Sequence, residues 1–560
     1  MNDTLENIRP LSQEEINQLT SQGCTASEWS QISVSPSLNL KDIINVRFTG
    51  PVVIHEGVVL REIPGGIGGC TLHKNVIIEN VASIEFDENS KNGVGTQVAV
   101  LDETGSRSVT IYPGLSSQAA TLMARVPDWF RDSVKPRLQE FLDSRTPLCE
   151  IGEGTIIKNS GKFKNVYIGR EVLIEGAGRL VNGSIINNAE RGKSITYIGT
   201  GVEAENFILE DCRLESKTTL FNSYVGQGVE ISHNFSVHDS LFFANCSMAN
   251  GEAHSILAGP YTVSMHKGTL LIGCQTSFMN AGSLSNQSNH MYKMGPVHWG
   301  LLERGVKTSS GSYLMLGAKI GAFSLLMGAH KGHPDSSEFP FSYLFGDERG
   351  TTVVVPALML RSCGLIRDEL KWPARDRRLN RGIPLIDHIT YAVLNPFTVD
   401  TMLKTVKTID SLLMRPAADD MYMRYKGMKF TRAALERARN LYTLAIFKYL
   451  SVTLPECRFP EPADNPPDTW IDLGGQIIPR EFLNRILQSD SLLDAENICA
   501  EAFERYKELE LSWVASRFGN DWRSRENEIS EMAQNYDKII EEDRQEYFDT
   551  LERENKMLDL

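Results

Sequence analysis

The chain has 560 residues, of which 41% are hydrophobic and 23% charged, and its formal net charge is −14 at pH 7. A chain of this length exceeds what one hydrophobic core usually serves, so we expect two to four folding units. The acidic balance argues against general binding of nucleic acid, which needs a broad basic surface, and favours small-molecule partners.

The amino terminus and the cysteines favour a cytoplasmic location. The first six residues lack the basic and apolar regions of a signal peptide, and no run of about 18 apolar residues predicts a membrane span. The nine cysteines are odd in number and contain no Cys-x-x-Cys pair. This pattern is typical of free thiols in a reducing compartment.

Residues 1–45 predict a short helix and a linker that precede the main fold. Ser12 and Glu15 have the spacing of a capping box, which starts a helix. A serine-rich stretch at 30–37 follows and is typical of a linker.

Residues 46–112 predict the first, irregular coils of a β-helix. Short β-type runs are separated by glycine pairs, and Leu72, Ile78 and Ile84 follow one another at a spacing of six. Apolar residues in 113–147 then follow helical spacing, with breaks at prolines, so we expect a helical insertion there.

A repeated motif dominates residues 148–362: an aliphatic residue, a glycine, two variable residues and a Thr, Val or Ser. In each unit the aliphatic residue would point inward from a short strand, and the small residue would let the backbone turn a corner. Such strands cannot bury their apolar face alone, so successive coils must stack, with loops where the spacing breaks. The motif starts at Ile151, Ile168, Ile198, Val225, Ile272 and Ile320.

Residues 363–560 predict an α-helical C-terminal region. Thr431 caps a segment with apolar residues on one face, and a second helical stretch follows at 495–514. Apolar residues near heptad spacing in 529–551 indicate a solvated helix or, alternatively, a subunit contact.

The repeated units resemble the left-handed β-helix (hexapeptide-repeat) superfamily over about 250–300 residues. That superfamily contains acyltransferases, the tail domains of sugar-nucleotide pyrophosphorylases and γ-class carbonic anhydrases. The resemblance implies a mainly β fold with a left-handed parallel β-helix, assembled as a homotrimer. The whole chain, and the stretch 286–300 in particular, also resembles an uncharacterised bacterial domain family known mainly from Bacteroidetes, which implies no function.

His238 is the first candidate for catalysis. Val237-His238-Asp239, followed by Ala-Asn and Gly-rich segments, resembles the catalytic segment of the superfamily's acyltransferases. This resemblance implies that His238 is a general base, that Asp239 or a nearby carboxylate orients it, and that an acyl group moves from CoA or acyl carrier protein to a sugar or sugar nucleotide. A neutral imidazole can accept the proton of the attacking hydroxyl or amine.

The same histidines allow a rival function. His233 and His238 have the spacing that resembles γ-class carbonic anhydrases, where histidines bind a metal. A catalytic zinc ion needs three protein ligands. The third would have to come from His254, His266 or a neighbouring subunit, so zinc is possible but no tightly bound cofactor is expected. Structural or surface histidines are the remaining alternative.

Two further segments are candidates for substrate binding. His266 and His330 each end one of two similar segments with a His-Lys-Gly turn, which predicts either a ligand edge or simple exposed turns. The stretch from 286 onward is unusually polar and aromatic for a coil, which is typical of binding loops. Its Trp299 could stack on a sugar or base, and its basic residues could hold phosphate, or the whole could be a packed structural loop. The candidate residues of this stretch are Asn289, His290, His298, Trp299, Arg304 and Lys307.

A basic cluster at 367–381 allows contact with the phosphates of a nucleotide or CoA, or salt-bridged helix ends. Three hypotheses follow for the chain: an acyltransferase, a metalloenzyme that uses His233 and His238, and a noncatalytic scaffold that binds a sugar or nucleotide.

Overall fold

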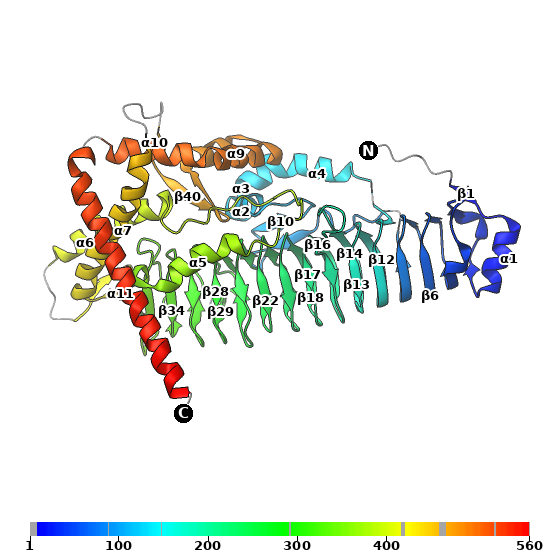
Figure 1. Ribbon diagram of the computed structural model, residues 1–560, viewed down its shortest axis with the longest axis horizontal. Helices are drawn as coiled ribbons and strands as arrows, with labels where there is room; N and C mark the ends of the chain where they lie inside the picture. Colours follow the sequence, from blue (N-terminus) through cyan, green and yellow to red (C-terminus); the bar gives the residue numbers. More distant parts are fainter. Residues whose placement is uncertain are drawn as a thin grey trace.

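The computed structural model describes residues 8–87, 89–146, 148–290, 293–415, 421–457, 466–519 and 522–558. The chain forms a long parallel β-solenoid, with helices along one side and at its C-terminal end (Figure 1). This confirms the mainly β fold with a parallel β-helix, a helical insertion and a helical C-terminal region.

The first of the three solenoid faces, face A, carries much of the repeated motif. Leu72, Ile151 and Ile168 pair in parallel register on successive coils and are fully buried inside the solenoid. Face A is formed by β3 (Ile32–Val34), β5 (Val52–Ile54), β7 (Cys70–Leu72), β11 (Glu150–Ile151), the last parts of β12 (Ile156–Ile168), β14 (Arg179–Ile186), β16 (Glu203–Glu210) and β18 (Thr219–Val225), and β21 (Leu241–Phe242), β24 (Leu257–Ala258), β27 (Cys274–Thr276), β30 (Gly300–Leu302) and β33 (Lys319–Ile320).

Face B buries a second column, which includes Ile157, Ile174 and Ile198. It is formed by the first parts of β4 (Ile43–Phe48), β6 (Val59–Gly68), β8 (Ile77–Glu85) and β12, and by β13 (Leu173–Glu175), β15 (Tyr197–Ile198), β17 (Arg213–Leu214), β19 (Glu230–Ser232), β22 (Ser247–Ala249), β25 (Val263–Ser264), β28 (Asn280–Ala281), β31 (Lys307–Thr308), β34 (Leu325–Met327) and β36 (Tyr343–Gly346).

Face C completes each coil and carries the histidines discussed below. Its inward column includes Leu220, Val237 and Ala253. It is formed by β2 (Thr25–Ala26), the last parts of β4, β6 and β8, the middle of β12, the first parts of β14, β16 and β18, and β20 (Ser236–His238), β23 (Glu252–His254), β26 (Leu270–Ile272), β29 (Asn286–Ser288), β32 (Tyr313–Met315) and β35 (Ala329–His330).

An asparagine ladder follows the corner from face C to face A. Asn182, Asn206, Asn222 and Asp239 adopt left-handed backbone conformations with φ between 46° and 55°. Each asparagine amide donates to the next rung: to Asn206 at 2.6 Å, to Asn222 at 2.9 Å and to Asp239 at 3.3 Å. Asparagine tolerates this conformation better than most residues, so the corner and the ladder stabilise each other.

The amino-terminal end of the solenoid lies earlier than the predicted boundary at residue 46. Strands β2 and β3 already pair with β4 and β5, so residues from 25 onward belong to the coils. Ahead of them, β1 (Arg9–Pro10) pairs antiparallel with β3, and α1 (Gln13–Ser21) begins with the capping box of Ser12 and Glu15.

Helical and hairpin elements cover face A on one side. The insertion contains the hairpin β9 (Gln97–Ala99) and β10 (Ser108–Thr110) and the helices α2 (Ser117–Arg125), α3 (Pro127–Trp129) and α4 (Lys135–Asp143). Gln275 on β27 donates to Thr121 of α2 at 3.2 Å, which ties the insertion to the outer side of face A.

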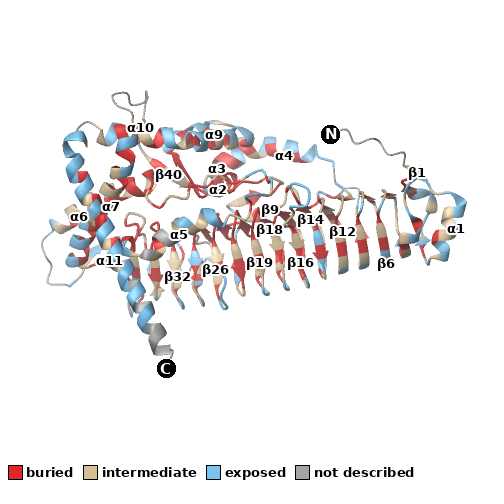
Figure 2. Cartoon of the chain, viewed as in Figure 1, coloured by how far each residue is buried: buried red, intermediate tan, exposed pale blue. Residues whose placement is uncertain are grey.

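The C-terminal region packs on the same side and over the end of the solenoid (Figures 1 and 2). Its first half contains β37 (Thr352–Val355), α5 (Cys363–Ala374), α6 (Pro396–Leu413), β38 (Met423–Tyr425), β39 (Met428–Phe430) and α7 (Arg432–Thr453). Its second half contains β40 (Trp470–Leu473), β41 (Gln476–Pro479), α8 (Arg480–Gln488), α9 (Leu492–Glu504), α10 (Tyr506–Phe518) and α11 (Glu526–Leu558).

Some of the apolar residues at near-heptad spacing in α11 pack against other parts of the same chain. Ile529, Tyr536 and Ile540 are buried, and the Tyr536 hydroxyl donates to the carbonyl of Leu360 at 3.2 Å. None of the helices in the described ranges is both long and apolar enough to cross a membrane.

Candidate functional site

The outward column of face C carries a ring stack on three successive coils. Phe221, His238 and His254 are paired in register on β18, β20 and β23. The ring centroids are 5.0 Å apart between Phe221 and His238, and 5.6 Å apart between His238 and His254. Both histidines are partly exposed, so they face outward from a rigid strand surface.

Glu103 reaches this column from the loop between β9 and β10. Its Oε1 atom lies 3.5 Å from Nδ1 of His254 and accepts a hydrogen bond from Nδ2 of Asn289 at 3.0 Å. The backbone N–H of Leu101 donates to the Ser255 carbonyl at 2.7 Å, which attaches the loop to the solenoid corner. Phe221, His238, His254, Glu103 and Asn289 together form what we call the histidine ridge.

The ridge has the arrangement of an oriented base. Nδ1 of His254 also lies 3.2 Å from the Ser255 hydroxyl, while its Nε2 has no hydrogen bond to any described residue. A carboxylate beside one ring nitrogen fixes the tautomer and leaves the other nitrogen to exchange a proton with a substrate.

The role predicted for Asp239 is not what the structure shows. Asp239 is the last rung of the asparagine ladder, with φ of 46°, and its carboxylate accepts from Asn222. The carboxylate beside the histidine stack is Glu103, which contacts His254 rather than His238. The strand pairing places His254 beside His238, whereas Glu103 belongs to the β9–β10 loop of the insertion, which is far from both histidines in the sequence.

His233 does not join His238. It lies in the exposed turn before β20, with φ of 55° and its Nδ1 2.7 Å from the Ser232 hydroxyl, whereas His238 ends that strand. Across the described ranges, no group of three or more His, Cys, Asp or Glu side chains could hold a metal ion. The described residues of a single chain therefore do not bring together the three protein ligands that a catalytic zinc ion needs.

The two His-Lys-Gly turns are also different from each other. His266 is exposed in the turn after β25, but His330 points into the solenoid and is fully buried. His330 Nδ1 lies 2.9 Å from the Thr352 hydroxyl, and burial lowers the pKa of His330 to about 4. The prediction that both histidines lie along one ligand-binding edge is wrong. His266 lies in a turn, whereas His330 lies in the strand β35 (Ala329–His330), where its side chain points inward.

Most candidates of the 286–310 stretch contact other parts of the chain. The Trp299 ring lies under the Arg107 guanidinium at 4.6 Å, and Lys307 forms an ion pair with Asp368. His298 lies 4.9 Å from the His333 ring, while His290 is exposed beside Met291 and Tyr292, which lie outside the described residues. Trp299 and Lys307 are therefore committed to packing rather than open to a sugar or phosphate.

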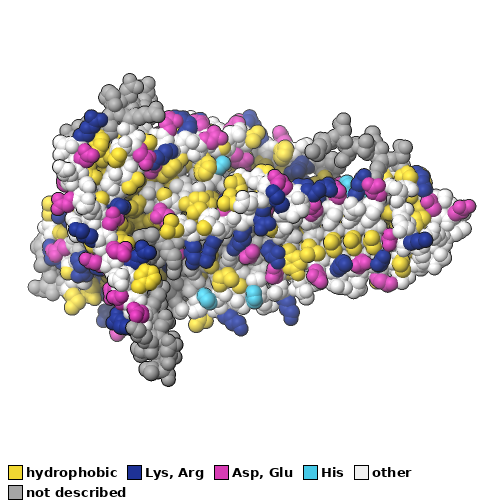
Figure 3. Space-filling view, in the orientation of Figure 1, with side chains coloured by type: hydrophobic (Ala, Val, Ile, Leu, Met, Phe, Trp, Pro, Cys, Tyr) yellow, Lys and Arg dark blue, Asp and Glu magenta, His cyan; other side chains and the backbone are white. Residues whose placement is uncertain are grey.

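The basic cluster near α5 is likewise engaged within the chain. Figure 3 shows a group of Lys and Arg side chains near the middle of the visible face, over α5 and adjoining coils. Arg377 donates to the Gly228 carbonyl and the Ser247 hydroxyl, and Arg378 pairs with Asp376 at 2.8 Å. These contacts fit the structural alternative for the cluster.

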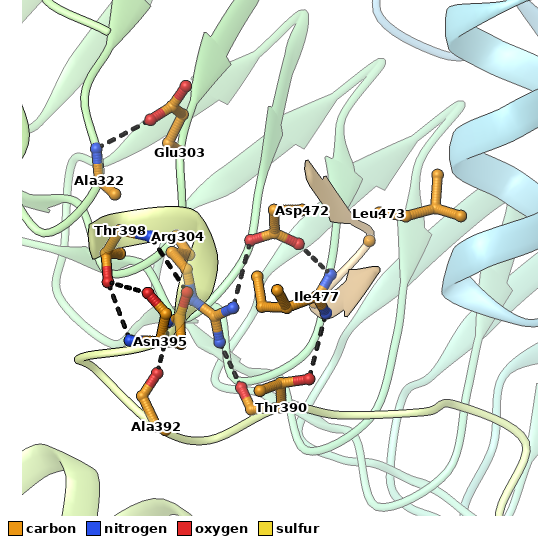
Figure 4. A network of polar contacts seen from close by, with 12 residues as sticks. Glu303, Arg304, Ala322, Thr390, Ala392, Asn395, Thr398, Asp472, Leu473 and Ile477 are labelled. Carbon is orange, nitrogen blue, oxygen red and sulfur yellow. Dashed lines mark hydrogen bonds and ion pairs between the residues drawn. The ribbon is translucent and has the colours of Figure 1, made fainter. Parts of the chain in front are cut away.

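Arg304 lies at a second site, a cavity of about 210 Å³ between the solenoid and the β40–β41 hairpin. Its side chain is fully buried, donates to the Thr390 carbonyl and lies 3.7 Å from Asp472 Oδ2 (Figure 4). The guanidinium also lies 4.9 Å from the Phe278 ring. Glu303, Gln275 and Thr276 line the same space, which we call the carboxylate–arginine cavity.

Burial changes the ionisation of this cavity. Glu303 accepts one hydrogen bond, from the Ala322 backbone at 3.0 Å, and burial raises the pKa of its carboxyl to about 8. Burial also raises the pKa of Asp472, against the opposing effect of Arg304. A carboxyl that is protonated at neutral pH can donate a hydrogen bond or a proton.

Glu303 was not among the candidates from the sequence, although a signal for it is present. Leu302-Glu303-Arg304-Gly305-Val306 follows the register of the repeat, with Glu303 at the position usually occupied by glycine. Glu303 and Arg304 place two charged side chains at a solenoid corner, and burying them costs free energy unless polar or charged partners are present. The pair therefore indicates that another segment covers this corner. The sequence does not indicate that this partner is Asp472.

The model of one protein family, the domain of unknown function DUF4954, matches residues 8–71 and 51–413. The chain belongs to the DUF4954 family. The matched part of this DUF4954 chain contains the whole histidine ridge and the solenoid side of the cavity, whereas Asp472 lies beyond it. No curated protein matches the chain.

Proposed function

We propose that this DUF4954 protein is a transferase that moves an acyl group from CoA or acyl carrier protein to a hydroxyl or amine of a sugar or sugar nucleotide. The observation that carries the proposal is the contact of His254 with Glu103 on the outward side of face C. His254 is the general base, in place of the His238 that the sequence indicated.

The proposed proton transfer uses both ring nitrogens of His254. Nε2 accepts the proton of the acceptor hydroxyl or amine as it attacks the thioester carbonyl. When the tetrahedral intermediate collapses, the carbon–sulfur bond breaks and the imidazolium returns the proton to the thiolate, which leaves as the thiol. The Glu103 carboxylate, 3.5 Å from Nδ1, stabilises the imidazolium that forms. Oriented bases of this kind contribute about 10²- to 10⁴-fold to rate.

His238 is a positioning residue in this proposal. Its ring stacks on His254, and the Phe221 ring supports it from the preceding coil. The stack limits rotation of the His254 ring and so keeps Nε2 in one direction.

A second copy of the chain supplies the other wall of the site in this proposal. The His254 side chain retains 32% of its surface exposed and lies on a strand face rather than in one of the cavities. A homotrimer with sites between prisms, as the superfamily resemblance implies, would enclose the acyl donor there.

The experiment compares full-length wild type with His254→Gln, using acyl-CoA or acyl carrier protein and sugar nucleotides, and detects the acylated product by mass spectrometry. We expect turnover to fall about 100-fold or more in His254→Gln. His266→Gln, which changes an exposed histidine in a turn, is the matched control and should keep wild-type turnover. Equal turnover of His254→Gln and wild type would overturn the role of His254.

A further inference from the structure

The carboxylate–arginine cavity contains buried polar atoms with no hydrogen-bond partner in the described chain. They are Nε and Nη1 of Arg304 and Oε1 of Gln275. Arg304 is 1% exposed and Gln275 5%. Buried polar groups are nearly always hydrogen-bonded, so donors and acceptors that converge on one cavity indicate a missing partner.

We propose that this cavity binds a small metabolite through an anionic group, a phosphate or a carboxylate, which Arg304, Arg125 and Arg480 hold. The three residues come from separate elements: Arg304 follows β30, Arg125 ends α2 and Arg480 begins α8. All three line the cavity.

Arg125 and Arg480 lie at the outer part of the cavity. Both residues are exposed, and neither guanidinium has a hydrogen bond or ion pair with a described residue. Arg304 lies deeper: its Nη2 donates to the Thr390 carbonyl, and its Nη1 faces Asp472 Oδ2 at 3.7 Å without a hydrogen bond, so Nε and the remaining hydrogen-bonding capacity of Nη1 are left to the ligand. Planar guanidinium groups match the oxygens of phosphate and carboxylate well.

The charge balance favours an anion. Three guanidinium groups face two carboxyl groups, Glu303 and Asp472. Because burial raises the pKa of Glu303 to about 8, this carboxyl is mostly neutral at pH 7 and adds a donor rather than a negative charge. Asp472 Oδ1 also accepts from the Gly475 N–H at 2.8 Å, so this carboxylate is already partly satisfied.

The volume of the cavity and its remaining polar groups restrict the kind of ligand that it can bind. A cavity of about 210 Å³ has room for about seven water volumes of ~30 Å³ each, which suits a small metabolite rather than a whole CoA. Oε1 of Gln275, on the outward side of β27, can accept a hydrogen bond from a hydroxyl or amide of the same molecule. The cavity shares no residue with the histidine ridge, so this inference stands apart from acyl transfer.

The experiment titrates full-length protein with inorganic phosphate and, separately, with succinate at pH 7, by calorimetry and thermal shift. We expect at least one of them to bind with a Kd of about 1 mM or tighter. Binding of phosphate alone assigns the ligand as a phosphate compound, and binding of succinate alone assigns it as a carboxylate.

Arg125→Gln and Arg480→Gln test the site without disturbing the buried Arg304. We expect each to weaken binding about tenfold and the double variant to abolish it, while Arg437→Gln, an exposed arginine on α7, leaves it unchanged. The inference is overturned if neither anion binds wild type at about 10 mM, or if the double variant binds as tightly as wild type.

Discussion

The Nδ1 atom of His254 lies 3.5 Å from Oε1 of Glu103, a residue of the β9–β10 loop. His254 ends β23, and the loop is attached at the next corner by the hydrogen bond from Leu101 to Ser255. An insertion therefore supplies the acid partner of a solenoid histidine, and the pair can be tested without disturbing the core.

Glu103→Gln should lower acyl-transfer turnover about tenfold, less than His254→Gln does. The amide oxygen can still accept from Asn289, but it cannot stabilise an imidazolium as a carboxylate can. Steady-state kinetics against pH measure the effect. Glu252→Gln, an exposed neighbour on β23, is the control, and equal losses in both variants would remove Glu103 from the mechanism.

Asp239→Asn should leave turnover unchanged and should not lower the melting temperature. Asparagine accepts the bond from Asn222 equally well and tolerates the φ of 46°. A large loss of turnover with the fold retained would restore Asp239 to the active site.

Asn206→Ala, in the middle of the same ladder, should destabilise the protein by about 2 kcal/mol. It removes the bond to Asn222 and the acceptor for Asn182 and places alanine at a φ of 55°. Thermal melting or urea unfolding measures the loss. A change within experimental error would show that the ladder contributes little.

Glu303→Gln should raise the melting temperature at pH 9 and leave it unchanged near pH 4.5. Burial raises the pKa of Glu303 to about 8 from the ordinary 4.5, so the folded state holds a proton that the unfolded chain releases between these values. Stability from this group is therefore present below about pH 4.5 and is lost as the pH rises to 8. Glutamine cannot ionise, and an identical pH dependence in the variant would contradict this assignment.

His330→Gln should make the protein less sensitive to acid. Burial lowers the pKa of His330 to about 4 from 6.5. Between pH 6.5 and pH 4, His330 is therefore protonated in the unfolded chain but neutral in the folded protein. Stability falls as the pH falls, by about 2 kcal/mol at pH 5 from this residue. Melting temperatures at pH 7 and pH 5 measure the difference, with His266→Gln as the exposed control.

Much of the scaffold could be predicted from local pattern. Ile151 and Ile168 begin equivalent motifs and are separated by one coil, so the repeat can be recognised from neighbouring residues. Ser12 and Glu15 likewise predict the start of a helix from a pattern within one turn. The site was predicted only in part. His238 was placed on a coil, but its relation to His254 depends on the register of neighbouring coils.

His266 is exposed and His330 is buried, although the two sequence segments that contain them are similar. Segment similarity therefore did not predict where these side chains lie. Successive residues of a strand point to opposite faces, so a small shift in position moves a side chain from solvent to core. His266 falls in an exposed turn and His330 in the inward column of face C.

The sequence by itself determined that this chain builds a parallel β-solenoid with helical additions, because the repeat and the helical spacing act between near neighbours. Only the tertiary structure decided which polar groups meet. Glu103 joins His254, and Asp472 joins Arg304, through segments inserted or appended far along the chain. Such contacts depend on how the covering segments pack on the solenoid, and no local periodicity encodes that packing.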